Sequence, residues 1–212
     1  MTSNREPSID LQRQIDDSIT TRNRSIADDS VTADGATSTS PRRPRTYATG
    51  RGRAAVEEPG IPPLGSKFEY LDHPADIVLH SWGIDLPEAL GNLATCMFGY
   101  ITCLDSISIS SAQSSKHGTR LIGIGHDLKS LVYSYLDEWL FNFHDTGFVP
   151  KEIEISELRR GVDDWSIVSS GKGEIWNINR HPQGTEVKAI TYSGMRIDEK
   201  QGRCDVYVVV DI

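Results

Sequence analysis

The chain has 212 residues and a formal net charge of −8, with 22 Lys or Arg against 30 Asp or Glu. Residues 1–66 hold nine Arg and nine acidic residues, so residues 67–212 carry the whole excess of acid. Because nucleic-acid-binding domains usually present a basic face, this acidity argues against a folded domain that grips a phosphate backbone by itself. It favours a cation or a basic protein partner.

Membrane insertion and secretion are not expected. No apolar run approaches the roughly 18 residues that a membrane span needs, and the polar N-terminus argues against a signal peptide. Cys96, Cys103 and Cys204 are odd in number and share no metal-ligand spacing. We therefore expect reduced thiols in a cytoplasmic or nuclear protein.

The first 66 residues differ in composition from the rest. They contain no Lys and one aromatic residue, Tyr47, and are dominated by Ser, Thr, Gly, Pro and Ala. Such a segment buries too little apolar surface to offset its conformational entropy, so we predict a disordered tail at residues 1–66 and one folded domain at residues 67–212. The Arg cluster at Arg42–Arg53 is typical of a weak RNA contact or a nuclear address, although a solvated linker is the commoner meaning of such a charge run.

In the first part of the domain, the sequence pattern predicts two strands and two helices. Strands at Phe68–Leu71 and Ile77–Trp82 flank the turn-forming DHPAD segment. In the second strand, one face is shared by Asp76, Val78, His80 and Trp82. Apolar residues recur at helical spacing after Asp85 and again after Asp127, and each aspartate is placed to cap its helix. Between the helices we expect a short strand at residues 107–109, a polar loop and an apolar stretch at residues 121–124.

In the second part of the domain, the sequence pattern predicts strands only. We expect them at residues 153–158, 165–169, 175–178, 186–197 and 203–212, with the last two joined by a hairpin at DEKQG. Two helices packed on one side of a mostly antiparallel sheet form an α+β sandwich, which is the predicted fold class.

The end of the sequence carries two carboxylates one residue apart, on Asp211 and on the main chain of Ile212. At the tip of a strand such groups are either held by water or gathered around a hard cation. Clustered carboxylates repel one another unless a counter-charge is present. Oxygen-only ligands favour Ca²⁺ or Mg²⁺ over zinc.

Other polar residues have common structural interpretations. Glu186 and Lys188 share one strand face, which is usually solvated, and an Asp beside a Pro turn, such as Asp76, is usually a turn or cap residue. His73 and His181 each precede a Pro, where the backbone is biased toward extended conformations. The sequence has no G-x-S-x-G, P-loop, H-E-x-x-H or C-x-x-C motif, so catalysis has little support.

Five segments taken together resemble the archease family. They are FEYLDHPADIVLHSWG, LPEAL with CMFGYIT, DLKSLVYSYLDEWLFNF, HPQGTEVKAITYSGM and the terminal VYVVVDI, and they span Phe68 to Ile212 in the family's order. The resemblance implies an α+β fold of the strand–helix–strand–strand type. It also implies a non-catalytic protein that activates an RtcB-type tRNA-splicing ligase by promoting its guanylylation and multiple turnover.

The resemblance also implies a site. Family members bind a divalent metal, usually assigned as calcium, through residues that correspond to Asp76, Asp211 and Ile212, and Ile212 contributes main-chain atoms only. Lys188 resembles a residue needed for ligase activation, and Glu186, His181 and His73 are further candidates for that role. The expected partner is the ligase or its complex, with RNA contacted only indirectly or weakly through the Arg-rich tail.

Two other classes of function stay open at this stage. One is a general chaperone-like adaptor for RNA-modifying enzymes. The other is a stand-alone metal-dependent hydrolase, in which Asp76 and Asp211 hold the metal and His181 acts as base. No motif in the sequence supports the hydrolase.

Overall fold

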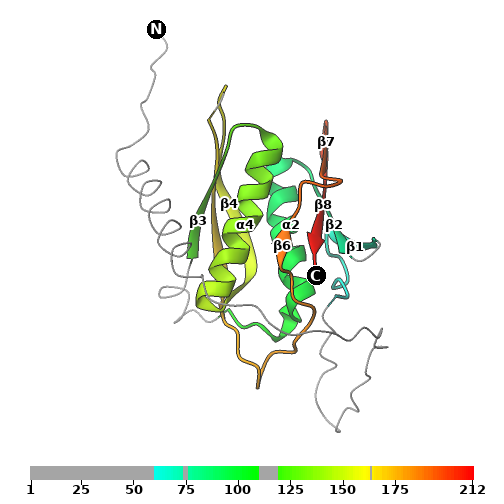
Figure 1. Ribbon diagram of the computed structural model, residues 1–212, viewed down its shortest axis with the longest axis vertical. Coiled ribbons are helices and arrows are strands. Elements are labelled where there is room, and N and C mark those ends of the chain that lie inside the picture. Colours follow the sequence, from blue (N-terminus) through cyan, green and yellow to red (C-terminus); the bar gives the residue numbers. More distant parts are fainter. Residues whose placement is uncertain (1–59, 74–75, 110–118, 163) are drawn as a thin grey trace, which may run out of the picture. The chain divides into compact units, whose positions relative to one another are not determined.

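The computed structural model describes residues 60–73, 76–109, 119–162 and 164–212. These residues form two antiparallel sheets and two helices (Figure 1). One sheet has the order β1-β2-β8-β6, with β7 also paired to β8, and the other has the order β3-β5-β4. The strands of the first sheet are β1 (Phe68–Asp72), β2 (Asp76–Gly83), β6 (Ala189–Ile190), β7 (Arg196–Lys200) and β8 (Arg203–Asp211). Those of the second are β3 (Thr119–Gly125), β4 (Phe148–Arg160) and β5 (Trp165–Ile175).

The helices α2 (Leu86–Ile101) and α4 (Leu128–Thr146) each pack against strands of both sheets. Helix α2 contacts β2 and β8 of the five-stranded sheet and β4 of the other, while α4 lies mainly on β3 and also contacts β5 and β6. Figure 1 shows both helices between the two groups of strands. The predicted α+β class, with two helices on antiparallel strands, is confirmed, but the strands divide into two sheets.

Both helices begin where the aspartates predict. The Asp85 carboxylate accepts the backbone N–H of Glu88 at 2.9 Å, and the Asp127 carboxylate accepts that of Ser130 at 2.7 Å. Each bond satisfies an N–H group that has no partner within its helix. Thr102 caps the C-terminus of α2, and Gly147 caps that of α4.

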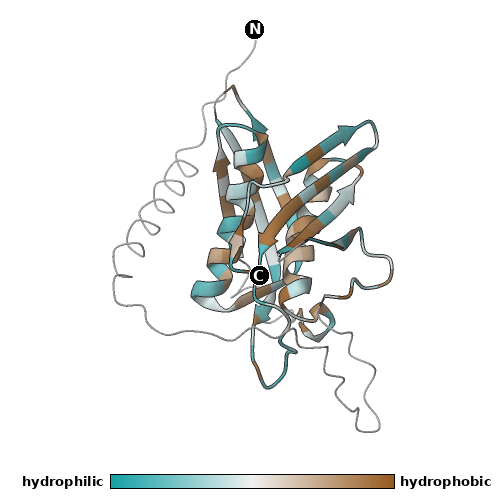
Figure 2. Ribbon diagram, turned by 45° about the vertical axis from the view of Figure 1, so that its right-hand side comes forward, coloured by the Kyte–Doolittle hydropathy of each residue, from teal (hydrophilic) through white to brown (hydrophobic). Residues whose placement is uncertain are grey.

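The core lies between the sheets and the helices, where Phe98 meets Trp139 and Phe143 edge to face. Alternation along β8 puts Val206, Val208 and Val210 in this core, with no exposed surface. The residues between them lie on the opposite face of the sheet. Figure 2 shows the resulting mixture of hydrophobic and hydrophilic positions along the strands.

Three predicted strands differ from the structure. Residues 107–109 are not a strand, because a 3-10 turn (Leu104–Ser106) leads into them and Ile107 is buried as a single side chain. Strand β5 ends at Ile175, and residues 176–178 enter a turn in which the carbonyl of Asn177 accepts the N–H groups of Arg180 and His181.

The strand predicted at residues 186–197 is two short strands, β6 and β7. A turn separates them, and within it Gly194 has φ of 64°, which side-chain-bearing residues rarely adopt. The hairpin between β7 and β8 is confirmed. Its loop is shorter than predicted, because Lys200 already pairs with Arg203, and Gly202 takes the left-handed position in the turn.

The predicted tail falls mostly on residues 1–59, which lie outside the described residues. Of residues 60–66, Gly60 donates its backbone N–H to the carbonyl of Gly99 at 3.0 Å. None of the described helices is long and apolar enough to cross a membrane. All three cysteines are buried.

Candidate metal-binding tip

Asp76 and Asp211 lie directly opposite each other, at the start of β2 and the end of β8. In an antiparallel pair the Cβ atoms of opposite residues are about 5 Å apart and project from the same face. The side chain of Asp76 is 30% exposed and Asp211 is exposed. Within the described part of the chain neither carboxylate forms an ion pair with Lys or Arg, so two like charges face each other without a cationic side chain.

Ile212 follows Asp211 at this tip. Its side chain packs against the hydrophobic core, on the same side of the sheet as Val210. This packing anchors Ile212 beside the Asp76–Asp211 pair.

Lys188 reaches the same tip through its backbone. Its N–H donates to the carbonyl oxygen of Asp211 at 2.9 Å, and the next residue, Ala189, pairs with Asp211 in the sheet. Glu186 and Lys188 are exposed on either side of Val187, which is 1% exposed. The predicted alternation of exposed and buried side chains is therefore present at residues 186–188, although these residues do not form a regular strand.

The segment that carries Glu186 and Lys188 is fixed by both helices. The N–H groups of Gly184 and Thr185 donate to the last carbonyls of α2, on Ile101 and Tyr100. On the α4 side, the ring Nε2 of His144 lies 3.4 Å from the carbonyl oxygen of Val187. The backbone around Lys188 is thus held in place by residues of α2 and α4, which are distant from it in the sequence.

His73 also belongs to the tip. Its Nδ1 lies 3.5 Å from Oδ2 of Asp76, and its carbonyl accepts the backbone N–H of Asp76 at 3.4 Å. The imidazole is 40% exposed, so it can approach or leave the carboxylate without disturbing the core.

His181 is placed differently from the other predicted site residues. Its side chain has no exposed surface; Nδ1 accepts the backbone N–H of Asn177 at 2.9 Å, and Nε2 lies 3.3 Å from Oε1 of Glu174. Burial raises the pKa of Glu174, but bonds from the Ser108 N–H and the Arg180 guanidinium outweigh it and leave the pKa below its ordinary value. His181 is therefore a buried anchor of its loop, without access to a substrate.

A second polar network lies on the outer face of the five-stranded sheet, away from the tip. His80 contacts Oε1 of Glu69 at 2.8 Å and Oδ1 of Asp205 at 3.0 Å, and its ring stacks on Tyr207 at 4.0 Å. Hydrogen bonds from Arg203, together with His80, lower the pKa of Asp205 to about 2. Sequence analysis placed His80 on this face but gave no signal for its partners, because they depend on strand register.

The side chains at the tip provide an incomplete metal site by themselves. Across the described residues there is no group of three or more His, Cys, Asp or Glu side chains that could hold a metal ion. Asp76 and Asp211 supply two carboxylates, and the third oxygen donor would come from the main chain of Ile212. This all-oxygen donor set suits a hard cation such as Ca²⁺ or Mg²⁺.

Comparisons with known proteins agree with the fold. Residues 68–212 match the model of the Archease protein family (MTH1598/TM1083). The chain is 43% identical over 153 residues to protein archease of Danio rerio, which covers 71% of this chain and 88% of the relative. It is 31% identical over 152 residues to protein archease of Methanosarcina mazei, which covers 72% of this chain and all of the relative.

A solved structure resembles the same part of the chain. The solution structure of Methanobacterium thermoautotrophicum protein 1598 has a TM-score of 0.56 at 26% identity. The similarity covers 69% of this chain and 99% of that protein.

Proposed function

The chain belongs to the archease family, and on that premise we propose that it is a metal-binding activator of an RtcB-type tRNA-splicing ligase rather than a catalyst itself. The observation that carries the proposal is the register of β2 and β8, which sets Asp76 opposite Asp211 beside the terminal residue. These are the residues that the family resemblance assigns to the metal.

In this proposal Asp76, Asp211 and the main-chain carboxylate of Ile212 hold a divalent cation, Ca²⁺ or Mg²⁺. The absence of a Lys or Arg partner for either aspartate within the described residues supports a cation at this position. When bound, the metal offsets the repulsion between the carboxylates and stiffens the tip. His73 lies against Asp76 and orients its carboxylate.

The exposed side chains beside the metal residues provide the contact with the ligase. Lys188 is exposed while its backbone is bonded to Asp211, so its ammonium group is presented from a fixed position. There it would pair with a carboxylate of the ligase or with a phosphate of GTP. The tip docks near the ligase active site and promotes guanylylation and repeated turnover, and Glu186 shares the contact surface. His181 supports the same segment from within the protein.

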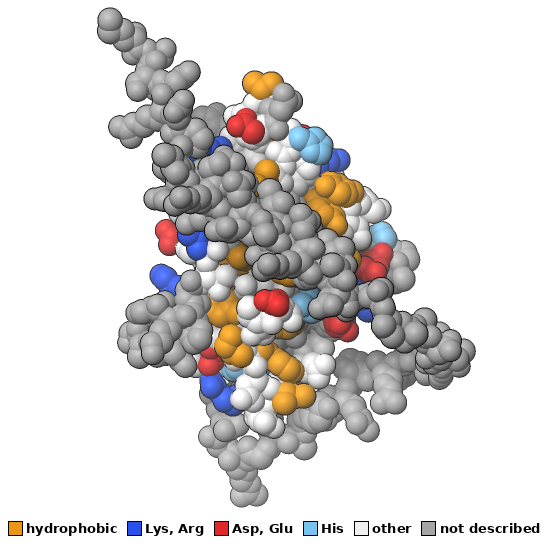
Figure 3. All heavy atoms as spheres, turned by 60° about the vertical axis from the view of Figure 1, so that its left-hand side comes forward, with side chains coloured by type: hydrophobic (Ala, Val, Ile, Leu, Met, Phe, Trp, Pro, Cys, Tyr) orange, Lys and Arg blue, Asp and Glu red, His pale blue; other side chains and the backbone are white. Residues whose placement is uncertain are grey.

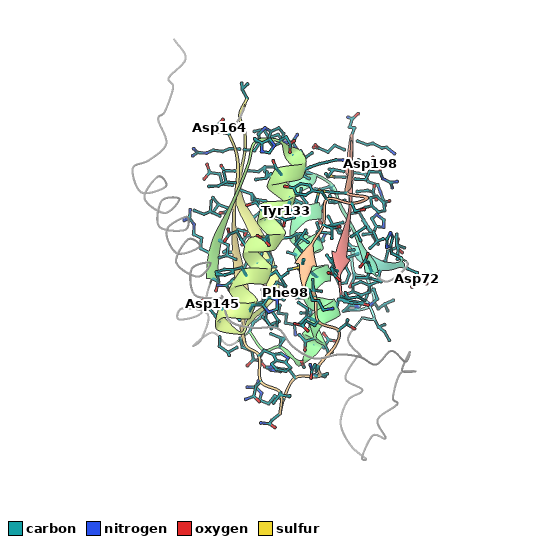
Figure 4. The ribbon with its side chains drawn as sticks, viewed as in Figure 1. Asp72, Phe98, Tyr133, Asp145, Asp164 and Asp198 are labelled. Atoms are coloured by element: carbon teal, nitrogen blue, oxygen red, sulfur yellow. The ribbon has the colours of Figure 1, made fainter. Side chains whose placement is uncertain are left out.

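The test is reconstitution of the ligase with GTP and a cleaved tRNA, in which guanylylation and the number of turnovers are measured with and without this chain. Asp76→Ala should abolish the acceleration. Asp198→Ala is the matched control, because it also removes one partly exposed carboxylate from the five-stranded sheet but lies in β7, at the end far from the C-terminus (Figures 1 and 4). Native acceleration by the Asp76→Ala protein would overturn the proposal.

The same assay separates the other classes of function. A stand-alone hydrolase would cleave RNA or nucleotides without ligase, and His181 would have to reach them as a base. Its buried ring beside Glu174 does not favour that role. A general adaptor would associate with several RNA-modifying enzymes in a pull-down, whereas the activator should recover the ligase complex as its main partner.

A further inference from the structure

Two tyrosines stack face to face at the surface between α4 and the turn that follows β6. Tyr133 belongs to α4 and Tyr192 to the turn, and their ring centroids are 4.5 Å apart with an interplanar angle of 1°. Figure 4 marks Tyr133 on α4, beside the chain that leads from β6 to β7. Tyr192 is 52% exposed. Because Tyr133 covers one face of the Tyr192 ring, the exposed surface lies on the other face and the edge.

The turn that carries Tyr192 is fixed on both sides. Before it, Ile190 is buried, and Thr191 donates its backbone N–H at 3.1 Å and its hydroxyl at 2.9 Å to the carbonyl oxygen of Val209. After it, the N–H of Met195 donates to the carbonyl oxygen of Tyr192 at 3.3 Å, and the Met195 side chain is buried. The ring is therefore presented from a fixed position before any partner binds, which lowers the entropy cost of binding.

A second parallel ring stack in the chain shows what such a surface accepts. His80 stacks on Tyr207 at 4.0 Å with an interplanar angle of 5°, and the guanidinium carbon of Arg196 lies 3.9 Å from the centroid of the Tyr207 ring. Since His80 occupies one face of this ring, Arg196 lies on the other and completes the stack. Among the described residues no Lys or Arg lies over the ring of Tyr192 in this way.

Two carboxylates of α4 lie near the exposed ring. Burial raises the pKa of Tyr192 above its ordinary value, and electrostatic interactions with Tyr133, Asp127 and Asp137 raise it further. Asp137 follows Tyr133 by one helical turn, and Asp127 is 60% exposed, while Lys129 offsets one of the two charges. A cation over this ring is attracted by the ring and the carboxylates together, whereas the phosphates of a nucleic acid are repelled. The outer face of the three-stranded sheet shows a different pattern, with acidic, basic and hydrophobic side chains interspersed (Figure 3).

We propose that Tyr192, backed by Tyr133, is a binding site for an arginine side chain of a partner protein. The guanidinium stacks flat on the free face of Tyr192, and the nearby carboxylates of α4 stabilise its charge. Arginine is favoured over lysine, because its planar group matches the ring and is more weakly hydrated than an ammonium group. The acidic excess of residues 67–212 favours the approach of such a partner. This site does not depend on the proposed metal or on ligase activation.

The experiment uses the full chain and a fluorescent hexapeptide that alternates Arg and Gly. Two control peptides separate the two features of the proposal: Lys in place of each Arg keeps the charge but removes the planar group, and citrulline keeps the planar group but removes the charge. Fluorescence anisotropy should show that the Arg peptide binds about threefold tighter than the Lys peptide and about tenfold tighter than the citrulline peptide. Backbone amide shifts in NMR spectra should change at Tyr192 and Gly194 when the Arg peptide binds.

Protein variants locate the binding to the ring. Tyr192→Ala should weaken binding of the Arg peptide about fivefold, whereas Tyr192→Phe, which keeps the ring face and removes only the hydroxyl, should bind with native affinity. Phe141→Ala is the control and should also bind with native affinity, since Phe141 is another exposed aromatic residue of α4. Equal binding of the Lys peptide, native affinity of the Tyr192→Ala protein, or no binding to the full chain would each overturn the proposal.

Discussion

The backbone N–H of Lys188 donates to the carbonyl oxygen of Asp211 at 2.9 Å, so the proposed activating residue is tied to a proposed metal ligand through main-chain atoms alone. This bond does not require the lysine side chain. Substitution of that side chain should therefore change the contact with the ligase while the tip keeps its shape.

Lys188→Ala is expected to reduce the acceleration of ligase guanylylation about tenfold, because the ammonium group that meets the ligase is lost. The melting temperature and the metal affinity of the variant should stay within experimental error of the native values. Guanylylation kinetics and thermal unfolding measure the two effects. Lys172→Ala provides the control, as Lys172 is an exposed lysine of β5. A large drop in melting temperature for Lys188→Ala would contradict the main-chain tie.

The helices and the core could be predicted from the sequence, because caps and helical spacing are local signals. Asp85 and Asp127 start their helices where the pattern places them. The pairing of Asp76 with Asp211 was not predictable from local pattern, since the two residues are 135 positions apart (211 − 76) and their pairing depends on the register between their strands. Only the family resemblance brought these two residues together in advance.

Errors along the chain also have physical causes. The strand predicted at residues 186–197 has the right alternation at Val187 but is interrupted at Gly194, whose left-handed conformation turns the chain. The local sequence also gave no signal that the ring of His181 is buried. Its neighbour Glu174, 3.3 Å away, is a residue of β5 that the local sequence does not connect to it.

Metal addition is expected to stabilise the folded chain. At a free concentration of 100 times its dissociation constant, Ca²⁺ should add about 2.7 kcal/mol to the free energy of unfolding. Asp76→Asn should weaken metal binding at least tenfold and, with chelator present, should raise the melting temperature slightly because the repulsion with Asp211 is reduced. Calorimetric titration and thermal unfolding with and without chelator measure both effects. An Asp76→Asn protein with native calcium affinity would exclude this carboxylate as a ligand.

The stability of the five-stranded sheet should depend on pH through Asp205. Hydrogen bonds from Arg203 and His80 lower its pKa from 3.8 to about 2, so its ionised form is favoured in the folded state. A carboxyl whose pKa is lowered by folding contributes stability above its unfolded pKa and loses it as pH falls through the folded value. The contribution is about 1 kcal/mol, since the Arg203 side chain is 55% exposed and solvent screens the pair.

Asp205→Asn therefore tests this pH dependence. Relative to the native chain it should be destabilised by about 1 kcal/mol at neutral pH, and the difference should shrink between about pH 4 and pH 2. Denaturant unfolding at several pH values measures it. Asp198→Asn, which alters a more exposed carboxylate of the adjacent strand, should show a much smaller change. A destabilisation that is constant down to pH 2 would show that Asp205 acts by packing instead.

An extension after Ile212 should impair the tip more than one at the N-terminus. Extension converts the main-chain carboxylate of Ile212 into an amide, which removes one negative oxygen donor, and it crowds the position beside Asp211 and Lys188. We expect a C-terminal hexapeptide of Gly and Ser to weaken calcium binding at least tenfold and to reduce ligase activation in parallel. The same hexapeptide at the N-terminus should leave both unchanged, because it leaves the carboxylate free. Calcium titration of the two proteins decides the matter: equal affinities would rule out the terminal carboxylate as a ligand and leave Asp76 and Asp211 as the only charged donors in the proposed site.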